Sequence, residues 1–458
     1  VQPQILPPLD PNFKPAVLCN MAFLKAVATS GKGIPVAIAL EADGGTVSTF
    51  QTAVFPNSDS RAQANLGYLE RIVKFLLWMK GGWRVIVGGH DELARQLAAI
   101  YSRSGARAFD VSLMEEVYGR PFVVESRPLA EMPADAGRAK PLGRHLDGCR
   151  IGFDLGASDR KVAAVVDGNS VYSEEVVWDP RGHNDPQYHF DEIMAALKKA
   201  ASYMPRVDAI GGSSAGIYVE NSVRVASLFR GVPKDMFEKR IRGLFHELRK
   251  AWHNIPFEVI NDGEVTALAG SMSLGVNRVL GIAMGSSLAA GYVDKDGNIP
   301  GWLDELAFTP VDYDPAAPVD EWSGDAGCGV QYFSQQGVNR LAEKAGIPLD
   351  PKRTLAERLK DVQALMEKDD PRARSVFESV GVCFGYAVAH YLDFYDIGHL
   401  LILGRVTSGK GGDLVLETAR RVLREEFPTL ASGVQLVVPD EASRRVGQAI
   451  AAASLPER

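Results

Sequence analysis

The sequence has 458 residues, enough for two or three domains that each bury a core of their own. Its composition, with 46% hydrophobic and 23% charged residues, is that of an ordinary globular protein. The net charge of −7 argues against a nucleic-acid-binding protein, which normally presents a basic face.

Cysteine usage and the lack of long apolar runs bear on the compartment. The four cysteines lie far apart and form no C-x-x-C pair, which is typical of isolated thiols in a reducing environment. No run approaches the ~18 apolar residues that a membrane span requires, and no signal peptide is recognisable at the start. We therefore expect a cytoplasmic protein that binds neither nucleic acid nor a membrane.

Residues 1–124 predict a small α/β domain. Strand-like runs at Ile34–Leu40 and Thr46–Phe55 flank Asp43–Gly45. This turn predicts a hairpin, because its glycines accept positive φ angles. Asn65–Lys80 then carries apolar residues at the helical period, and a short buried strand and another helix follow.

Two stretches show no periodic pattern. Residues 1–15 are rich in proline, which favours an extended arm lying on another surface. In residues 125–147 the composition shifts to Pro, Ala, Arg and Gly, which predicts a linker between domains.

Beyond the linker, Arg150–Val166 predicts two strands joined by a tight turn. Asp154 stands at the end of the first strand, and small residues occupy the turn from Gly156 to Asp159. Such a turn lets the phosphate groups of a nucleotide approach backbone N–H groups, and the aspartate suits a magnesium ion. A plain hairpin with a polar turn is the alternative interpretation.

The next strand, Arg206–Gly212, runs into a loop that contains Ser214 and Gly216. A loop of glycine and serine at the carboxyl end of a strand suits a polar substrate, but it is also a common turn.

Phe257–Gly270 is the most informative stretch of the sequence. An apolar run with Val259 and Ile260 predicts a strand that ends at Asn261 and Asp262, and a helix follows. In open α/β folds, ligands bind in the crevice outside the carboxyl ends of the strands. Asp262 is therefore a candidate general base.

The C-terminal half also contains strands that run into turns or loops with glycine. A strand at Val279–Met284 enters a turn with Gly285 and Ser286, and a partner strand leaves it. Residues 296–297, Asp-Gly, predict the turn of a further hairpin. After three predicted helices, a strand runs into a glycine-rich loop that begins at Gly404, and a helix, a strand and a terminal helix follow.

The order of these segments resembles the sugar-kinase branch of the actin-like ATPase superfamily, and within it the ROK family (repressors, open reading frames and kinases). The resemblance covers roughly residues 149–455. It rests on the segments IGFDLGASDRKVAAVVDG, EVINDGEVTALAG, GIAMGSSLAAGYVDKDGNI and LLILGRVTSGKGG. No single match is specific, but their shared order and spacing are.

The resemblance implies a fold class and a domain plan. The fold is an α/β, ribonuclease H-like fold with two lobes, residues 148–262 and 263–458, preceded by an additional N-terminal α/β domain. The C-terminal helix is able to pack back on the first lobe. The family's repressors carry a winged helix at the N-terminus, and this chain does not, which argues against a repressor.

The resemblance also implies roles for residues, with ATP and magnesium as cofactors. The family's catalytic base falls on Asp262, and its sugar contacts fall on Asn261 and Glu305. With the loop described above, Ser214 and Gly216 complete the expected substrate site. The residues expected at the nucleotide are Asp154, Gly156, Ser158, Gly285, Ser286 and Gly404, with Asp154 also holding magnesium.

The sequence departs from the family pattern around both ligands. Bulkier or charged residues replace family glycines and a lysine near the phosphates, and apolar residues replace a histidine and a glutamate near the sugar. The cysteine cluster is reduced to Cys328, so we expect no zinc, which needs four nitrogen or sulfur ligands. The departing residues are Ala157, Ser158, Asp159, Ser287, Ala289, Ala290, Phe308, Val330 and Arg405.

Two functions remain open from the sequence. The first is ATP-dependent phosphorylation of a hydroxyl of a sugar or sugar derivative, with Asp262 as the base. The alternative is a non-catalytic protein that binds a carbohydrate or a nucleotide, which the altered phosphate loops favour. In either case we expect a small-molecule sugar as partner and a homodimer.

Overall fold

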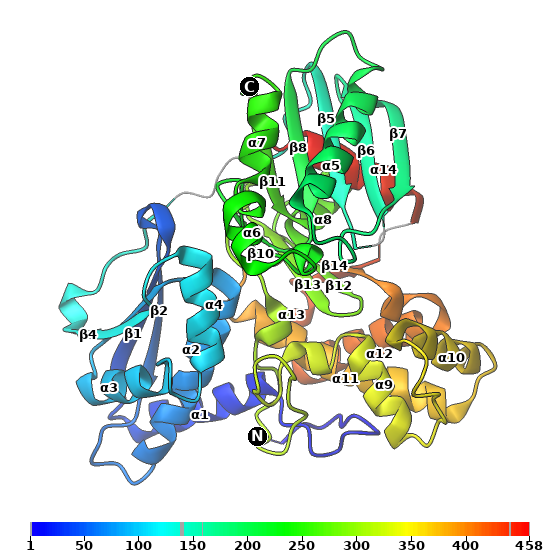
Figure 1. The fold of residues 1–458 in the computed structure, drawn as a ribbon. Helices are drawn as coiled ribbons and strands as arrows, with labels where there is room; N and C mark the ends of the chain where they lie inside the picture. The colour runs from blue at the N-terminus through cyan, green and yellow to red at the C-terminus, as the bar shows by residue number, and fades with distance from the viewer. Residues whose placement is uncertain (1, 138–141, 158, 439–440, 458) are drawn as a thin grey trace.

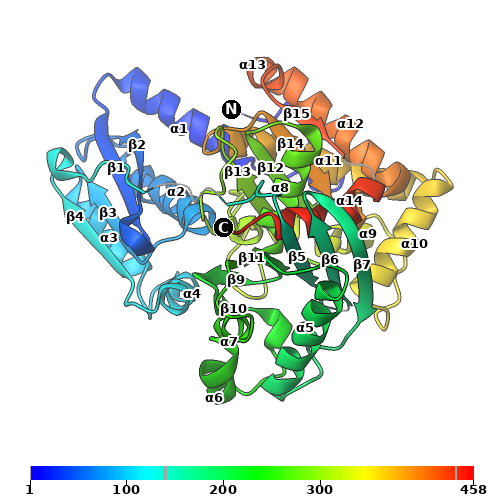
Figure 2. The ribbon, with the colours of Figure 1, turned by 90° about the horizontal axis from the view of Figure 1, so that it is seen from above.

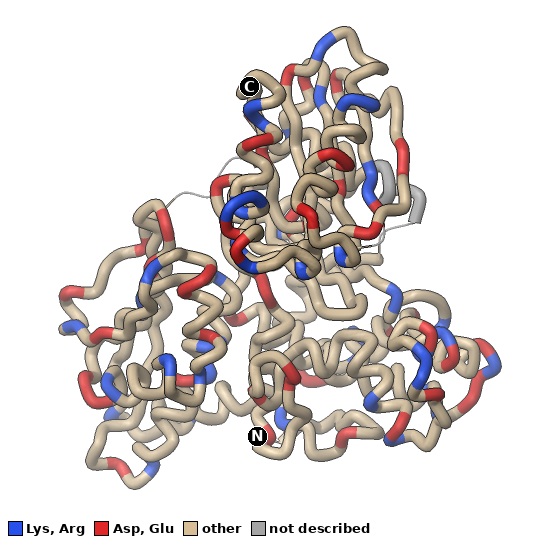
Figure 3. The backbone as a smooth tube through the Cα atoms, in the orientation of Figure 1, with Lys and Arg blue, Asp and Glu red and all other residues tan. Residues whose placement is uncertain are grey.

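The computed structural model describes residues 2–137, 142–157, 159–438 and 441–457, except for the side chains of residues 441–446. An N-terminal domain stands beside two lobes that are stacked on each other (Figures 1 and 2). Basic and acidic residues are interspersed along the backbone of all three bodies (Figure 3). None of the helices in the described ranges is long and apolar enough to cross a membrane.

The N-terminal domain is a four-stranded sheet with helices. Its elements are α1 (Ala16–Ser30), β1 (Ile34–Glu41), β2 (Val47–Val54), α2 (Asn65–Lys80), β3 (Arg84–Gly88), α3 (Asp91–Ile100), α4 (Ala108–Tyr118) and β4 (Val123–Arg127). The strand order is β2-β1-β3-β4, and only the β3–β4 pair is parallel. The predicted hairpin and helix α2 are confirmed. The predicted linker start at residue 125 falls inside β4, because that strand pairs with β3.

The first lobe is built on a five-stranded sheet. Its elements are β5 (Cys149–Leu155), β6 (Asp159–Val166), β7 (Asn169–Val177), α5 (Pro186–Ala201), β8 (Ala209–Ser214), β9 (Ile217–Val219), β10 (Ser222–Val225), α6 (Lys234–Met236), α7 (Leu244–Ala251) and β11 (Phe257–Asn261). In the order β11-β8-β5-β6-β7, the first three strands in sequence form an antiparallel meander. Strands β8 and β11 then add parallel to β5, so that Leu155, Ser214 and Asn261 end in register at one edge.

The second lobe follows the same plan with one strand fewer. Its elements are α8 (Asp262–Leu274), β12 (Val279–Met284), β13 (Leu288–Val293), α9 (Gln335–Lys344), α10 (Leu355–Glu367), α11 (Pro371–Leu392), β14 (His399–Leu403), α12 (Gly409–Glu426), α13 (Pro428–Ala431), β15 (Gln435–Val437) and α14 (Glu441–Ala453). The strand order is β13-β12-β14-β15, and β12, β14 and β15 are parallel.

The hairpin predicted at residues 296–297 is wrong. The chain turns there, but no strand of the second-lobe sheet follows in the described structure. Instead the backbone N–H groups of Asp304 and Glu305 donate to the carbonyl oxygens of Met79 and Trp78, at 2.9 and 3.0 Å. These carbonyls lie at the end of α2, where a helix leaves its last carbonyl groups unpaired. The segment that follows the turn is therefore hydrogen-bonded to the end of α2.

Helix α14 crosses from the second lobe to the sheet of the first. A Cβ at Gly152 would lie 1.9 Å from the carbonyl oxygen of Ala449, and one at Gly211 would lie 1.7 Å from that of Ala452. Glycine at these two positions lets the helix backbone approach the sheet. The expectation that the C-terminal helix packs back on the first lobe agrees with this contact.

The N-terminal domain shares its core with the second lobe. Phe75 and Met79 of α2 are fully buried in one apolar cluster with side chains of α11, such as Tyr391. The proline-rich arm lies on the second lobe as expected, with Asp10 paired to Arg340 and Lys344 at 2.9 and 2.8 Å. These two bodies therefore form one packed unit.

A cluster of buried ion pairs lies at the same interface, between the N-terminal domain and the second lobe. Asp325 of the second lobe accepts from three cations of the N-terminal domain: Lys74 at 2.9 Å, Arg107 at 2.7 Å and Arg71 at 3.0 Å. Lys74 is fully buried and also lies 3.3 Å from Asp110. A charge removed from water in this way is tolerated only while its partners are present.

Replacing Asp325 with alanine tests this attachment. The substitution leaves Lys74 and two arginines short of their shared partner, and an unpaired buried charge costs about 3–5 kcal/mol. We expect the free energy of unfolding in urea to fall by that amount. The control is Asp59→Ala, which removes an ion pair with the half-exposed Arg61 and should leave the transition in place. Equal effects of the two substitutions would show that the cluster adds no stability.

Candidate active site

Asp262 lies where strand β11 ends and helix α8 begins. Asn261 is the N-cap of this helix: its Oδ1 accepts from the N–H of Gly263 at 2.7 Å, and Glu264 accepts from the N–H of Asn261 in return. Such a reciprocal capping box fixes the first turn of a helix. Asp262 is thereby held as the first helical residue, where the positive end of the helix dipole favours a carboxylate.

Two further carboxyl groups, Asp154 and Glu305, are electrostatically coupled to Asp262, and Asp304 is coupled to Glu305. Burial, reinforced by the charge of Asp154, raises the pKa of Asp262 to about 6. Burial followed by the charges of Asp262 and Asp304 raises the pKa of Glu305 to about 7. The pKa of Asp304 also rises to about 7 through burial, although the Tyr395 hydroxyl donates to it at 2.7 Å. Groups that titrate near neutrality are suited to proton transfer.

Asp154 lies at the carboxyl end of β5, as predicted, and two polar side chains contact it. Its Oδ1 accepts from the Ser213 hydroxyl at 2.7 Å, and the Lys161 ammonium lies 3.4 Å from its Oδ2. Burial raises the pKa of Asp154 despite both partners. Lys161 was missed from the sequence, although the alternation of a strand places it on the same face as Asp159. In the β5–β6 register it stands directly opposite Asp154.

The glycines expected at the nucleotide gather at the edges of the two sheets. In the first lobe, the N–H of Gly156 donates to the carbonyl oxygen of Asp159 at 2.9 Å, which closes the tight turn. In the second, Gly285 and Gly404 follow the ends of the neighbouring parallel strands β12 and β14. Gly404 has a φ of +100°, and a Cβ there would lie 2.3 Å from the carbonyl oxygen of Met284.

The serines of these turns are placed differently. Ser286 is exposed at the tip of the β12–β13 turn, and Ser158 lies outside the described residues.

The loop after β8 is tied to Asn261. The side-chain amide of Asn261 donates to the carbonyl oxygen of Gly216 at 2.7 Å, so Gly216 adjoins the candidate site. Ser214 is fully buried, and its hydroxyl bonds to that of Tyr218 at 2.6 Å. The structure thus brings Gly216 to the site and turns Ser214 toward Tyr218.

The N-terminal domain covers the position where the family histidine is replaced. Phe308 packs against Trp78 of α2, with ring centroids 4.3 Å apart, and against Phe109 of α4 at 5.6 Å. Val330 is buried in the core of the second lobe. Of the two apolar substitutions noted in the sequence, Phe308 is therefore part of the contact with the N-terminal domain, and Val330 is part of the core.

Cys328 lies beside the buried ion cluster. Burial raises the pKa of its thiol to about 12, and its Sγ lies 3.8 Å from Asp325. Within the described ranges, no group of three or more His, Cys, Asp and Glu side chains is arranged to hold a metal ion. The absence of zinc remains a prediction.

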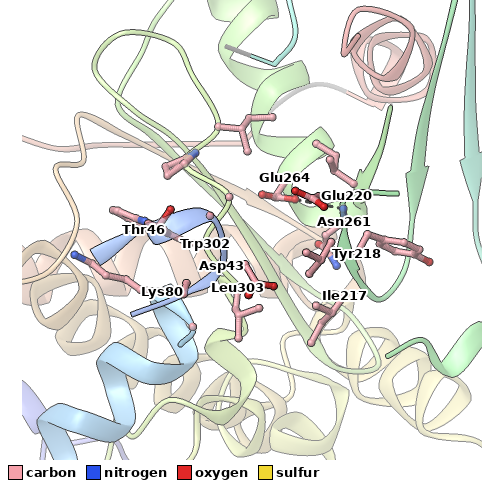
Figure 4. Close-up of a pocket in the computed structure, with 18 of the residues that line it drawn as sticks. Asp43, Thr46, Lys80, Ile217, Tyr218, Glu220, Asn261, Glu264, Trp302 and Leu303 are labelled. Carbon is pink, nitrogen blue, oxygen red and sulfur yellow. Dashed lines mark hydrogen bonds between the residues drawn. The ribbon is translucent and has the colours of Figure 1, made fainter. Parts of the chain in front are cut away.

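A cavity of about 330 Å³ lies where the three bodies meet (Figure 4). This cavity was not predicted, because its walls come from segments far apart in the chain. The N-terminal domain contributes the β1–β2 hairpin and the end of α2, the first lobe contributes the β9 strand, and the second lobe contributes residues 299–303. Asn261 and Gly216 are among the predicted site residues that line it.

Substituting Asp262 with asparagine should stabilise the protein. The raised pKa means that the folded state holds the proton more tightly than the unfolded state does, so ionisation costs stability. This cost is absent below pH ~4, grows up to pH ~6 and then stays constant. One pKa unit corresponds to about 1.4 kcal/mol, so we expect Asp262→Asn to gain about 1–3 kcal/mol at pH 8.

Urea unfolding at pH 8 and pH 4 measures this effect. The gain should disappear at pH 4, where wild-type Asp262 is itself neutral. A variant that is less stable than wild type at pH 8 would contradict the assigned environment of Asp262.

No protein-family model and no curated protein matches the sequence. Among solved structures, the ROK hexokinase from Thermus thermophilus is similar with a TM-score of 0.53 and 19% identity, over 66% of this chain and 97% of its own. A ROK family transcriptional regulator, a homolog of the E. coli MLC protein, also reaches a TM-score of 0.53, at 18% identity, over 68% and 79% of the two chains. Such identities show a shared fold. This chain therefore has the two-lobed α/β fold of the ROK family, of the actin-like ATPase type.

Proposed function

We propose that this protein transfers the terminal phosphoryl group of ATP to a hydroxyl group of a sugar or sugar derivative. The observation that carries the proposal is the environment of Asp262. This carboxyl group stands at the junction of the lobes, where burial, reinforced by the charge of Asp154, raises its pKa to about 6, and its own charge raises the pKa of Glu305. The ROK fold supports the proposal but does not decide it, because a hexokinase and a regulator share that fold.

Asp262 would act as the general base. With a pKa of about 6 it is mostly ionised at neutral pH, and yet it is basic enough to accept the proton of an attacking hydroxyl. A positioned base of this kind contributes about 10²–10⁴-fold to the rate. Asn261, the helix cap, holds the base in place through the first turn of α8.

Glu305 would bind the sugar as both donor and acceptor. Its pKa of about 7 means that the protonated form is well populated at neutral pH, so the carboxyl group can donate to one oxygen and accept from another. The backbone of Glu305 is fixed by its hydrogen bond to α2 at 3.0 Å. This contact would orient the sugar relative to Asp262.

The residues at the sheet edges fit a nucleotide with magnesium. Asp154 supplies the carboxylate oxygens that magnesium prefers, and Gly156 and Gly285 begin tight turns at the strand ends, where phosphate groups would approach. Gly404 permits a close approach of backbone, since a Cβ would strike Met284. Bound Mg-ATP would supply the phosphoryl group and neutralise its developing charge. Lys161, 3.4 Å from Asp154, adds a cation at the same edge.

A non-catalytic sugar-binding protein is the second candidate. The observation that favours it is the ion pair between Lys161 and Asp154, which gives the expected magnesium ligand a protein partner. A protein of this kind would bind a sugar but form no phosphorylated product.

A phosphorylation screen with Mg-ATP and a panel of hexoses, amino sugars and polyols tests the proposal. Any turnover found should fall at least about a hundredfold in Asp262→Asn, the lower bound for loss of a general base. The matched control is Asp393→Asn, since burial also raises the pKa of Asp393 to about 6, at the end of α11. We expect this control to keep its activity.

Two outcomes would count against the kinase. Unchanged turnover in Asp262→Asn would refute the role of the base. Stabilisation by a sugar without phosphorylated product from any panel member would favour the second candidate; a ligand at a hundred times its Kd adds about 2.7 kcal/mol.

A further inference from the structure

The cavity between the three bodies adjoins the proposed base without containing it. Neither Asp262 nor Glu305 lines it, whereas Asn261 and Leu303, which stand one and two positions away in the chain, do. A single sugar ring held by Asp262 and Glu305 would therefore leave this space free. Its volume of about 330 Å³ lies within the range of ~300–1,000 Å³ found for small-molecule sites.

Each wall of the cavity is held in place by specific contacts. On the N-terminal side, the Lys80 ammonium lies over the ring of Trp302, 4.9 Å from its centroid, which ties α2 to the second lobe. On the side of the first lobe, Asn221 anchors the β9–β10 turn to β11, donating to Phe257 at 2.9 Å and accepting from Val259 at 2.7 Å. The walls of the cavity are therefore fixed by contacts within the described structure.

The lining is polar at both ends. In the view of Figure 4, Lys80 and Thr46 lie toward one end, and Glu220, Asn261 and Glu264 lie toward the other. Hydroxyl and carboxylate groups of this kind are partners that sugar hydroxyls need. The charged lining residues are four carboxylates and one ammonium: Asp43, Glu220, Glu258, Glu264 and Lys80. This balance favours a neutral ligand over a sugar acid or a sugar phosphate.

We infer that this cavity binds a second sugar ring, so that the substrate is a neutral disaccharide or glycoside rather than a free monosaccharide. The inference rests on the proposed function, which places the reacting ring at Asp262. The N-terminal domain then serves as the third wall of the substrate site. Its β1–β2 hairpin selects substrates by the group attached to the reacting ring.

The test is a bulky substitution in that wall. Ser48 lines the cavity from β2, opposite Leu40 of β1. The substitution Ser48→Trp therefore fills part of the cavity and leaves the proposed catalytic residues of the two lobes unchanged. Gln51→Trp is the matched control, because Gln51 lies on the same strand, is exposed and is not part of this lining. The thermal unfolding of both variants is measured first, to establish that each is folded.

Calorimetric binding is then measured with maltose, cellobiose, lactose, sucrose and trehalose, each beside its constituent monosaccharides. We expect at least one disaccharide to bind at least tenfold more tightly than its monosaccharides. Ser48→Trp should weaken that binding at least tenfold, while Gln51→Trp leaves it unchanged. The inference is overturned if no disaccharide binds more tightly than its monosaccharides, or if folded Ser48→Trp binds them as wild type does.

The same sugars separate this inference from the proposed function. A disaccharide that binds but is never phosphorylated with Mg-ATP retains the two-ring site and removes the kinase. Phosphorylation confined to monosaccharides, with no effect of Ser48→Trp, retains the kinase and removes the two-ring site.

Discussion

The partial burial of the Asp262 carboxyl group is the constraint on which the rest of the site depends. A carboxyl group at its ordinary pKa of 3.8 would be too weak a base for efficient proton abstraction, and burial is the largest cause of its rise to about 6. The charge of Asp262 in turn raises the pKa of Glu305. A backbone hydrogen bond to the end of α2 holds Glu305 in place. The N-terminal domain is thus part of the electrostatics of the site.

The same domain packs on Phe308, a residue at which the sequence was expected to depart from the ROK pattern. Where a ROK kinase would place a histidine, Phe308 packs against Trp78, and the remaining cysteine, Cys328, lies beside a cluster of buried ions. Both changes suit a surface that faces another domain rather than solvent or a metal ion. A buried salt bridge is weak evidence for stability in general. Here three cations converge on Asp325, which fixes how the domain is seated.

The sequence predicted much of the frame because local signals were strong. Asn65–Lys80 has the predicted first and last residues, since its apolar periodicity is strong and a glycine follows its last residue. The two lobes followed from the order of the strand-turn motifs. Helix α4 and strand β4 were not recognised, because Asp110 takes its partner from α2 and β4 takes its partner from β3.

The site could be predicted only where one short segment determines it. Asn261 and Asp262 stand where the strand–helix boundary places them. The cavity was not predicted because its walls lie far apart in the chain, and Lys161 was not predicted because its role depends on strand register.

The pH dependence of kcat/KM for the phosphorylated sugar tests the central claim, that Asp262 is the general base, most directly. If Asp262 is the base, kcat/KM falls about tenfold per pH unit below pH ~6, and it declines again above pH ~7 as Glu305 loses the proton that it donates to the sugar. A profile that is flat from pH 5 to pH 8 would contradict this account.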